Sequence, residues 1–481
     1  MPASNTSKPR KKLLSVADCQ SLNINEVHSL YRQHVNSSKV DLLSIFDFGN
    51  ELVDKAQGLN IYTKSGRVVN DFTGGYGVLS HGHNHPRILK VRQDFQNQHR
   101  MEVHKNFFSQ YIAALSHNLS ILLPGDLDYS FFPNSGSEAV DGALKTAFKY
   151  HDGKRKHFLY SNIAFHGKLF AADSVTNSPE NHYEYPKLAN THQFEFNNIA
   201  SVKQVLDKLR DKNGACTVCG LILEPFNISN LRECSAEFLL AVRELCSKED
   251  IVLIFDEIYS GWCKSGELFY FMKIPGLLPD VLCMAKSFGG GKSSISGMVT
   301  RKKIFKKAFD TPKAANMQSS TFYAFGEETV TALEAVNIII EEDFVIKSQR
   351  IEKKLSSGFQ KLKNKYPQII TDARGAGAIH GIFINPGPKI LGKLVNYIPG
   401  EIFNDERFMA KLVTTAVISH LYTHHNILTF TSLGYEIHLI VAPPLVVTDD
   451  EIDHFFACLD KTLAEGLLSL VIKFAKKKFF K

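Results

Sequence analysis

Long apolar runs are missing from this sequence of 481 residues. A helix that crosses a membrane needs about 20 consecutive apolar residues, so we expect no membrane partner. The short segment LLSVA at residues 13–17 is followed by polar residues and does not form the apolar core of a secretory signal. These absences predict a cytoplasmic protein.

Cysteine is also scarce, with 8 residues spread along the whole chain. That spread does not form a disulfide framework and fits a reducing compartment. The CxxC pair Cys216 and Cys219 has no second pair at zinc-site spacing, and the alternating His81, His83 and His85 have no carboxylate or cysteine at ligand spacing. We therefore expect no metal.

Charge is unbalanced only at the ends of the chain. The net charge is +7, and much of it comes from residues 8–12 and from the lysines after residue 472. Such ends are more often solvated tails than polyanion-binding sites, so we expect a disordered basic tail at residues 1–25 and no nucleic-acid partner. The remaining composition, 44% hydrophobic and 22% charged, is typical of a globular protein.

The middle of the chain alternates helix-like and strand-like segments. An amphipathic stretch at residues 201–214 precedes the apolar run GLILEP, and a second helical stretch precedes IVLIFDE. This rhythm predicts an α/β fold with a parallel sheet. Glu224 and Asp256 end these two strands, at the sheet edge where α/β proteins bind their ligands.

Lys286 follows another apolar run, PDVLCMA, and precedes three glycines. A lysine in apolar surroundings is a potential nucleophile, and an aspartate on a neighbouring strand can hold a pyridinium nitrogen protonated. Together Lys286 and Asp256 indicate pyridoxal 5'-phosphate (PLP) chemistry. The segment Gly291-Lys292-Ser293 imitates a nucleotide phosphate loop, but that motif requires glycine at position 286.

A phosphate site is predicted at Ser135, Gly136 and Ser137, which precede a helical pattern of apolar residues. Free N–H groups and the dipole at a helix N-terminus favour phosphate. The alternative is an ordinary helix cap without a ligand. Lys286 and Asp256 favour the phosphate.

The chain resembles the class III (ω-type) aminotransferases, PLP-dependent enzymes of fold type I. The resemblance covers roughly residues 45–465, and its segments occur in the family's order: DFTGGYGVLSHGHNHPRI, FFPNSGSEAVDGALKTA, AFHGK, LILEPF, DEIYSGWCKSGELF, PDVLCMAKSFGGG, SSTF and VAPPLVVTDDEID. It implies a large domain with a mostly parallel sheet between helices, and a smaller α+β domain built from the N- and C-terminal segments. It also implies a homodimer with shared active sites.

The resemblance implies domain limits as well: an N-terminal arm at residues 26–75, a PLP-binding domain at 76–335 and a C-terminal small domain at 336–481. By the same resemblance, a Schiff base forms on Lys286, which then moves the substrate proton, while Asp256 keeps the pyridine nitrogen protonated. The other implied cofactor-binding residues are Ser135, Gly136 and Ser137 at the phosphate, Thr321 at the phosphate of the neighbouring subunit, Phe165 on the ring face, Tyr259 near the 3-hydroxyl, and His166 and Glu224.

Two departures from the family's pattern concern the substrate. Ile440 stands where the family often has an arginine that binds the substrate carboxylate, and the glutamate that pairs with it is absent after Glu224-Pro225. Loss of one member would strand a buried charge, whereas loss of both is coherent. We therefore expect transamination of an amine, diamine or ω-amino compound with a carbonyl acceptor. Another arginine over the substrate, such as Arg374, would contradict this expectation.

Three alternatives remain open at this stage. The same cofactor chemistry also serves decarboxylases, aminomutases and racemases. A non-catalytic relative would keep the fold as a binding module, although the intact Lys286 and Asp256 argue against it. The basic ends leave a polyanion-binding or membrane-surface role as the third alternative.

Overall fold

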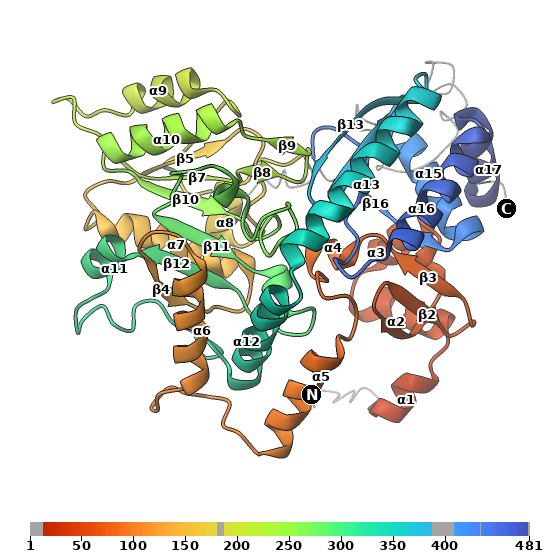
Figure 1. Cartoon of the computed structure of the whole chain (residues 1–481), viewed down its shortest axis with the longest axis horizontal. Coiled ribbons are helices and arrows are strands. Elements are labelled where there is room, and N and C mark those ends of the chain that lie inside the picture. Colours follow the sequence, from red (N-terminus) through yellow and green to blue (C-terminus); the bar gives the residue numbers. More distant parts are fainter. Residues whose placement is uncertain (1–12, 180–186, 387–407, 433, 480–481) are drawn as a thin grey trace, which may run out of the picture.

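The structure, a computed structural model, describes residues 13–179, 187–386, 408–432 and 434–479. One part of the molecule holds the large central sheet, and the other part brings the N-terminal and C-terminal segments together (Figure 1). Within the described residues, no helix is both long and apolar enough to cross a membrane.

The central sheet has seven strands in the order β4-β12-β11-β10-β7-β5-β6. Neighbouring strands are parallel except at β12, which is antiparallel to both β4 and β11. The strands are β4 (Leu127–Phe131), β5 (His157–Ser161), β6 (Thr191–Phe194), β7 (Val218–Leu223), β10 (Val252–Asp256), β11 (Val281–Met284) and β12 (Gly297–Arg301). The predicted α/β fold with a mostly parallel sheet is confirmed.

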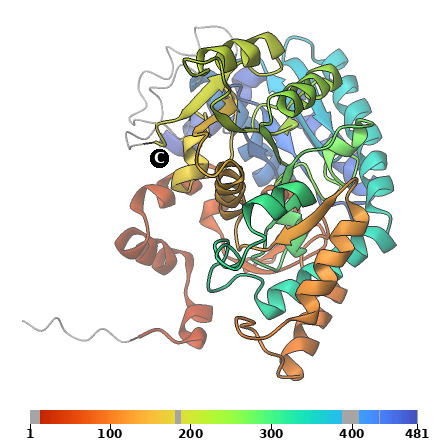
Figure 2. The same cartoon turned by 90° about the vertical axis from the view of Figure 1, so that its left-hand side faces the viewer.

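Helices cover both faces of this sheet (Figures 1 and 2) because the inner strands are apolar on both sides. Successive residues of a strand point to opposite faces: Ile254 packs in the cluster on the α7 side, whereas Phe255 packs in the main core. The helices of this part are α5 (Pro86–Asn97), α6 (Gln110–Leu122), α7 (Gly136–Tyr150), α8 (Phe170–Ser174), α9 (Ile199–Lys208), α10 (Ala236–Lys248), α11 (Lys302–Ala308) and α12 (Gly326–Glu341).

The smaller part contains two four-stranded sheets, β1-β2-β3-β15 and β13-β14-β17-β16. Strands β2 and β3 form an antiparallel hairpin, and β15 pairs in parallel with β3. The strands are β1 (Val53–Gln57), β2 (Asn60–Thr63), β3 (Val68–Asp71), β13 (Ile370–Ala376), β14 (Ile379–Ile384), β15 (Ile427–Leu428), β16 (Phe430–Thr431) and β17 (Leu439–Val441). The predicted small domain built from both ends of the chain is confirmed, while its limits in the sequence remain a prediction.

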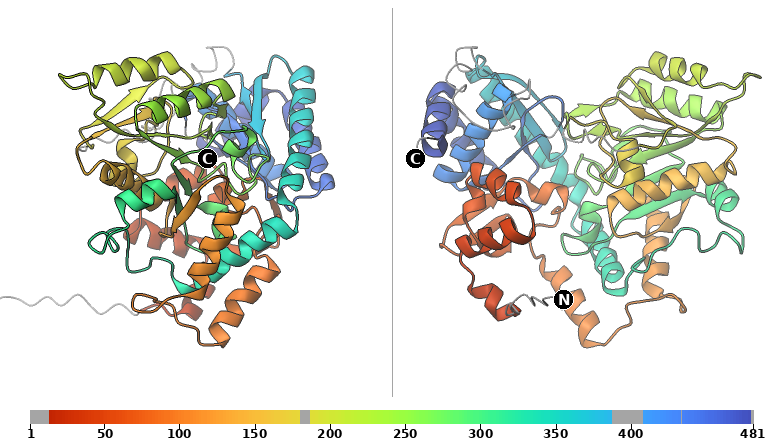
Figure 3. Two further views of the ribbon diagram at one scale, coloured as in Figure 1. Left: turned by 60° about the vertical axis from the view of Figure 1, so that its left-hand side comes forward. Right: turned by 180° about the vertical axis from the view of Figure 1, so that it is seen from behind.

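The N-terminal helices lie beside the C-terminal helices (Figure 3). Asp47 joins them, because its carboxylate accepts a hydrogen bond from Ser419 at 2.6 Å and lies 2.9 Å from Lys477. The helices are α1 (Val16–Ser21), α2 (Ile24–His34), α3 (Ser37–Ile45), α13 (Phe344–Lys365), α15 (Phe408–His425), α16 (Asp449–Ala464) and α17 (Leu467–Phe479). Helix α1 lies within the segment we expected to be disordered, of which residues 1–12 fall outside the described residues.

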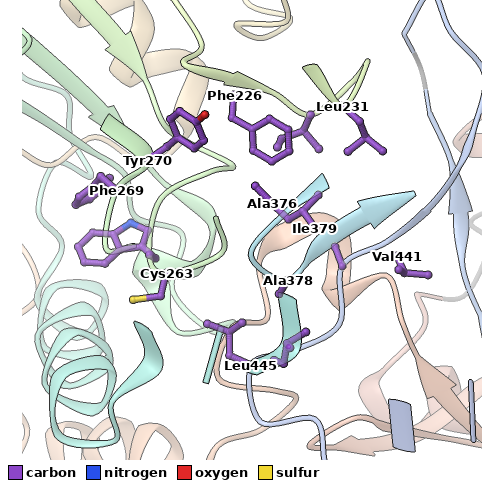
Figure 4. Close-up of a cluster of buried hydrophobic side chains, with 14 of the residues drawn as sticks. Phe226, Leu231, Cys263, Phe269, Tyr270, Ala376, Ala378, Ile379, Val441 and Leu445 are labelled. Carbon is purple, nitrogen blue, oxygen red and sulfur yellow. The ribbon is translucent and has the colours of Figure 1, made fainter. Parts of the chain in front are cut away.

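The remaining short elements connect these layers. They are α4 (Gly74–Gly77), β8 (Phe226–Asn227), β9 (Arg232–Glu233) and the 3-10 turns η1 (Phe48–Asn50), η2 (Tyr270–Lys273) and η3 (Lys286–Gly289). One continuous core joins the two parts of the molecule. Figure 4 shows the junction, where Phe226 and Tyr270 from the large part lie near Ala376 and Ile379 from the small part.

Candidate active site

A cavity of about 1250 Å³ lies where the carboxyl ends of β7, β10 and β11 meet the small part. Every predicted site residue except Thr321 lines it: Ser135, Gly136, Ser137, Phe165, His166, Glu224, Asp256, Tyr259 and Lys286. These residues come from separate segments of the sequence, and the parallel sheet brings them together because its strand ends share one edge.

Lys286 starts η3, two residues after β11 ends, and has a φ of 52°. This left-handed backbone is uncommon for a residue other than glycine and marks a constrained position. Its Nζ lies 3.9 Å from the centre of the Tyr259 ring. Burial lowers the pKa of Lys286 to about 8, against the opposing effect of the Asp256 and Glu224 charges. A larger fraction of this amine is therefore neutral near pH 7 than of an ordinary lysine.

Asp256 is the last residue of β10 and is 4% exposed. Its Oδ1 accepts the N–H of Ile258 at 3.0 Å, and its Oδ2 accepts a hydrogen bond from His166 Nδ1 at 2.8 Å. Two donors thus fix the carboxylate, and charge-assisted bonds of this kind are strong. Among the described residues, the second ring nitrogen of His166, Nε2, is buried and has no partner.

Glu224 directly follows β7 and holds the loop that carries Phe165. Its Oε2 accepts the N–H of Phe165 at 3.0 Å and the side-chain N–H of Asn227 at 2.7 Å. Burial raises the pKa of Glu224 to about 7. Sequence reasoning missed Asn227, which is 1% exposed and also donates to the carbonyl of Ile163.

The start of α7 forms a compact cradle. Ser135 caps the helix, and its hydroxyl accepts the N–H of Glu138 while Glu138 binds back to the Ser135 N–H. A Cβ on Gly136 would lie 2.8 Å from Ile258 Cδ1, and one on Gly167 would lie 2.1 Å from Ser137 Oγ. The two loops therefore approach closely only because both positions are glycine. The first N–H groups of a helix have no partner within it and suit an anion.

These residues fit PLP as a donor set. The helix N-terminus suits a phosphate, the buried carboxylate suits a protonated pyridine nitrogen, and the desolvated amine suits an aldehyde. The hydroxyl of Tyr259 is buried and has no hydrogen-bond partner among the described residues. Burial raises the pKa of Tyr259, so the phenol remains a donor for a ring hydroxyl.

Thr321 lies on the surface, outside the cavity of its own chain. The loop around it is nevertheless attached to the site, because Asn134 donates a hydrogen bond to the carbonyl of Phe322 at 3.0 Å. Phe322, the residue after Thr321, is 58% exposed. The role of Thr321 at a neighbouring subunit remains a prediction.

The substrate side of the cavity agrees with the departures in the sequence. Ile440 on β17 lines the cavity, whereas Arg374 lies outside it, paired with Asp372 at 2.7 Å and Glu436 at 3.1 Å. Among the residues that the structure describes, none of those lining the cavity is an arginine. Arg374 therefore does not replace the missing carboxylate ligand.

Comparison with known proteins gives the following findings. The family model described as class-III aminotransferase matches residues 49–463. The fold is similar to the ornithine aminotransferase from Toxoplasma gondii ME49 (TM-score 0.77, 19% identity, 95% of this chain and 98% of that chain). It is also similar to the ω-transaminase from Pseudomonas jessenii in complex with PMP (TM-score 0.76, 19% identity, 90% of this chain and 95% of that chain). A third match is the acetylornithine aminotransferase from Elizabethkingia anophelis (TM-score 0.70, 20% identity, 92% of this chain and 100% of that chain).

Proposed function

The chain belongs to the class III aminotransferase family, and we propose that the cavity around Lys286 is its active site. The protein is a PLP-dependent aminotransferase, which moves an amino group from a donor to a carbonyl acceptor. When bound, PLP supplies an aldehyde for the amino group and a ring that accepts the electrons of the broken C–H bond.

Lys286 would bond covalently to the cofactor and later move the proton at its Nζ. The position supports both roles, because the amine lies in the cavity and its pKa is lowered to about 8. A base whose pKa is close to the working pH is efficient in both directions of proton transfer. Lys292, six residues later, is exposed and would take no part.

Asp256 would hold the proton on the pyridine nitrogen, and His166 would orient that carboxylate through the 2.8 Å hydrogen bond. Tyr259 would donate its buried hydroxyl to the ring hydroxyl, and Phe165 would cover the ring face. Glu224 would act indirectly, because it holds the backbone of Phe165.

The phosphate would bind at Ser135, Gly136 and Ser137, with Thr321 contributed by a second copy of the chain. We propose a homodimer with shared active sites because Thr321 and the next residue, Phe322, are exposed, and Phe108 elsewhere on the surface is 105% exposed. Exposed apolar patches mark interaction surfaces. We also infer a cytoplasmic location, which the 8 free cysteines support.

The substrate would be an amine, diamine or ω-amino compound without a carboxylate next to the reacting carbon. The observation that carries this proposal is the replacement of the arginine by Ile440, 1% exposed in the cavity wall, while Arg374 is engaged elsewhere. A carboxylate against such a wall would lose its water without gaining a partner.

The test compares 2-aminopropane with alanine, which has a carboxylate in place of one methyl group. The purified enzyme is mixed with each amine, and conversion of the bound cofactor is followed in the visible spectrum. We expect faster conversion with 2-aminopropane. Preference for alanine would contradict the proposal, and consumption of a 2-oxo acid acceptor distinguishes transamination from decarboxylation or racemisation.

A further inference from the structure

The cavity is larger than the cofactor site. Its volume of about 1250 Å³ exceeds the roughly 300–1,000 Å³ of most small-molecule pockets. Beyond Lys286, elements distant in the sequence build its wall: α3 and the turn after it, β8, β16, α15 and α17. The apolar side chains that define this chamber are Phe46, Phe226, Phe408, Leu412, Phe430 and Phe474.

Part of the chamber wall is buried and already formed. Leu412 and Phe474 are 4% and 5% exposed, yet both line the cavity. The wall is held by the contacts of Asp47 with Ser419 and Lys477 and by an edge-on contact between Phe48 and Tyr422, whose ring centres are 5.7 Å apart. A preformed apolar wall binds a ligand without first paying for its own ordering.

Charged side chains are few among the described residues that line this chamber. Among the described residues that line the cavity, the two carboxylates are Glu224 and Asp256, and both lie at the cofactor end with hydrogen-bond partners of their own. Lys411 is the lysine on the chamber side. Of the described residues, none on the chamber side therefore offers a carboxylate to a second ammonium group of a diamine, and an unpaired buried charge is costly.

We propose that the chamber takes the tail of the amine substrate, and that this tail is long, apolar and uncharged. The proposal rests on the proposed function and narrows it: within amines, diamines and ω-amino compounds, it selects monoamines with an alkyl or aryl chain. Each added methylene that enters the chamber is expected to raise kcat/KM up to about fourfold, until the chamber is full.

The first experiment measures kcat/KM for unbranched alkylamines from butylamine to dodecylamine, with 1,8-diaminooctane and 8-aminooctanoate as charged equivalents of octylamine. We expect kcat/KM to rise with chain length, and octylamine to exceed both charged compounds at least tenfold. A flat series overturns the proposal and leaves the proposed function intact. The proposal is also overturned if kcat/KM for the diamine or for 8-aminooctanoate equals or exceeds that for octylamine. In the case of 8-aminooctanoate, Lys411 would then be the partner of the substrate carboxylate.

A second experiment needs no reaction. Binding of 1-octanol, which has the tail without the amine, is measured by calorimetry on the PLP-loaded enzyme and on the variants Phe474→Gln and Ile472→Gln. Both substitutions lie on α17, but Ile472 is 38% exposed and does not line the cavity.

We expect Phe474→Gln to weaken octanol binding at least fivefold and to reduce kcat/KM for octylamine more than for butylamine, while Ile472→Gln changes neither. The melting temperature and the bound-PLP absorbance of each variant, compared with the wild type, show that both variants are folded and loaded. Octanol binding that is absent, or equal in the two variants, overturns the chamber proposal. If no amine of any length reacts, the proposed function fails while the octanol titration still decides whether the chamber binds a tail.

Discussion

Replacement of Asp256 by asparagine keeps the shape of the side chain and removes its charge. The carboxylate is 4% exposed and accepts hydrogen bonds from Ile258 N–H and His166 Nδ1. Asparagine can still accept one of them, so we expect the free energy of unfolding to fall by only about 1–3 kcal/mol. The variant should remain folded.

Its activity should fall much further. Without the negative charge, nothing at the end of β10 holds a proton on the pyridine nitrogen, and removal of one preorganised electrostatic partner costs about 10²–10³-fold in kcat. The Asp256 charge also raises the pKa of Lys286 against the effect of burial. We therefore expect the pKa of Lys286 to fall further below its usual value in Asp256→Asn.

Two assays test these effects separately. The first is kcat with a reactive monoamine. The second is the rate of PLP uptake by the apoenzyme, measured as a function of pH. This rate increases as Lys286 loses its proton. We expect its midpoint near the pKa of about 8 in the wild type and at lower pH in the variant.

Asp280→Asn is the matched control for Asp256→Asn. Asp280, directly before β11, is also a buried carboxylate, paired with Arg243 at 2.9 Å and away from the cavity. We expect it to lose about 3–5 kcal/mol of stability and to keep kcat in the folded fraction. Wild-type kcat and an unchanged pH midpoint in folded Asp256→Asn would refute the assigned role of Asp256.

Three further predictions concern other parts of the molecule. Lys264 is fully buried, and burial lowers its pKa to about 7. Between about pH 7 and 10 the unfolded chain binds more protons at this lysine than the folded chain, so Lys264 makes the free energy of unfolding rise with pH in that range. Urea unfolding of Lys264→Met should show that this contribution to the pH dependence is lost. Gly136→Ala places a Cβ 2.8 Å from Ile258 and should raise the Kd for PLP, measured by absorbance titration, about tenfold or more. Thr321→Ala should raise the Kd for PLP three- to tenfold, consistent with one lost hydrogen bond of about 1 kcal/mol, and an unchanged Kd would exclude its contact with a partner's phosphate.

The sequence was sufficient for the fold and for the cofactor end of the site. Asp256 ends a buried strand, and Glu224 and Lys286 closely follow two others. Such strands are visible as apolar runs followed by polar residues, and parallel strands bring these residues to one edge. The glycine loop before α7 could be predicted for the same local reason, because a helix start is encoded in a few neighbouring residues.

The chamber could not be predicted in this way. Leu412 and Phe474 lie on α15 and α17, and Phe46 directly follows α3. These segments meet only through tertiary packing, and each residue is an ordinary apolar position in its own segment. Asn227 was also missed, since its function is to bind Glu224 across a turn. Helix α1 was missed because a capped single turn adds little to composition, although Ser15 and Asp18 form its capping box.

The central claim is that Lys286 binds the cofactor. The measurement that tests it most directly is the visible absorption spectrum of the purified protein with added PLP, compared with Lys286→Ala and with Lys292→Ala as the exposed control lysine. The account predicts a band of lysine-bound cofactor in the wild type and in Lys292→Ala, lost on addition of a monoamine, and no such band in Lys286→Ala. A band that persists in Lys286→Ala, or that is absent from the wild type, would contradict it.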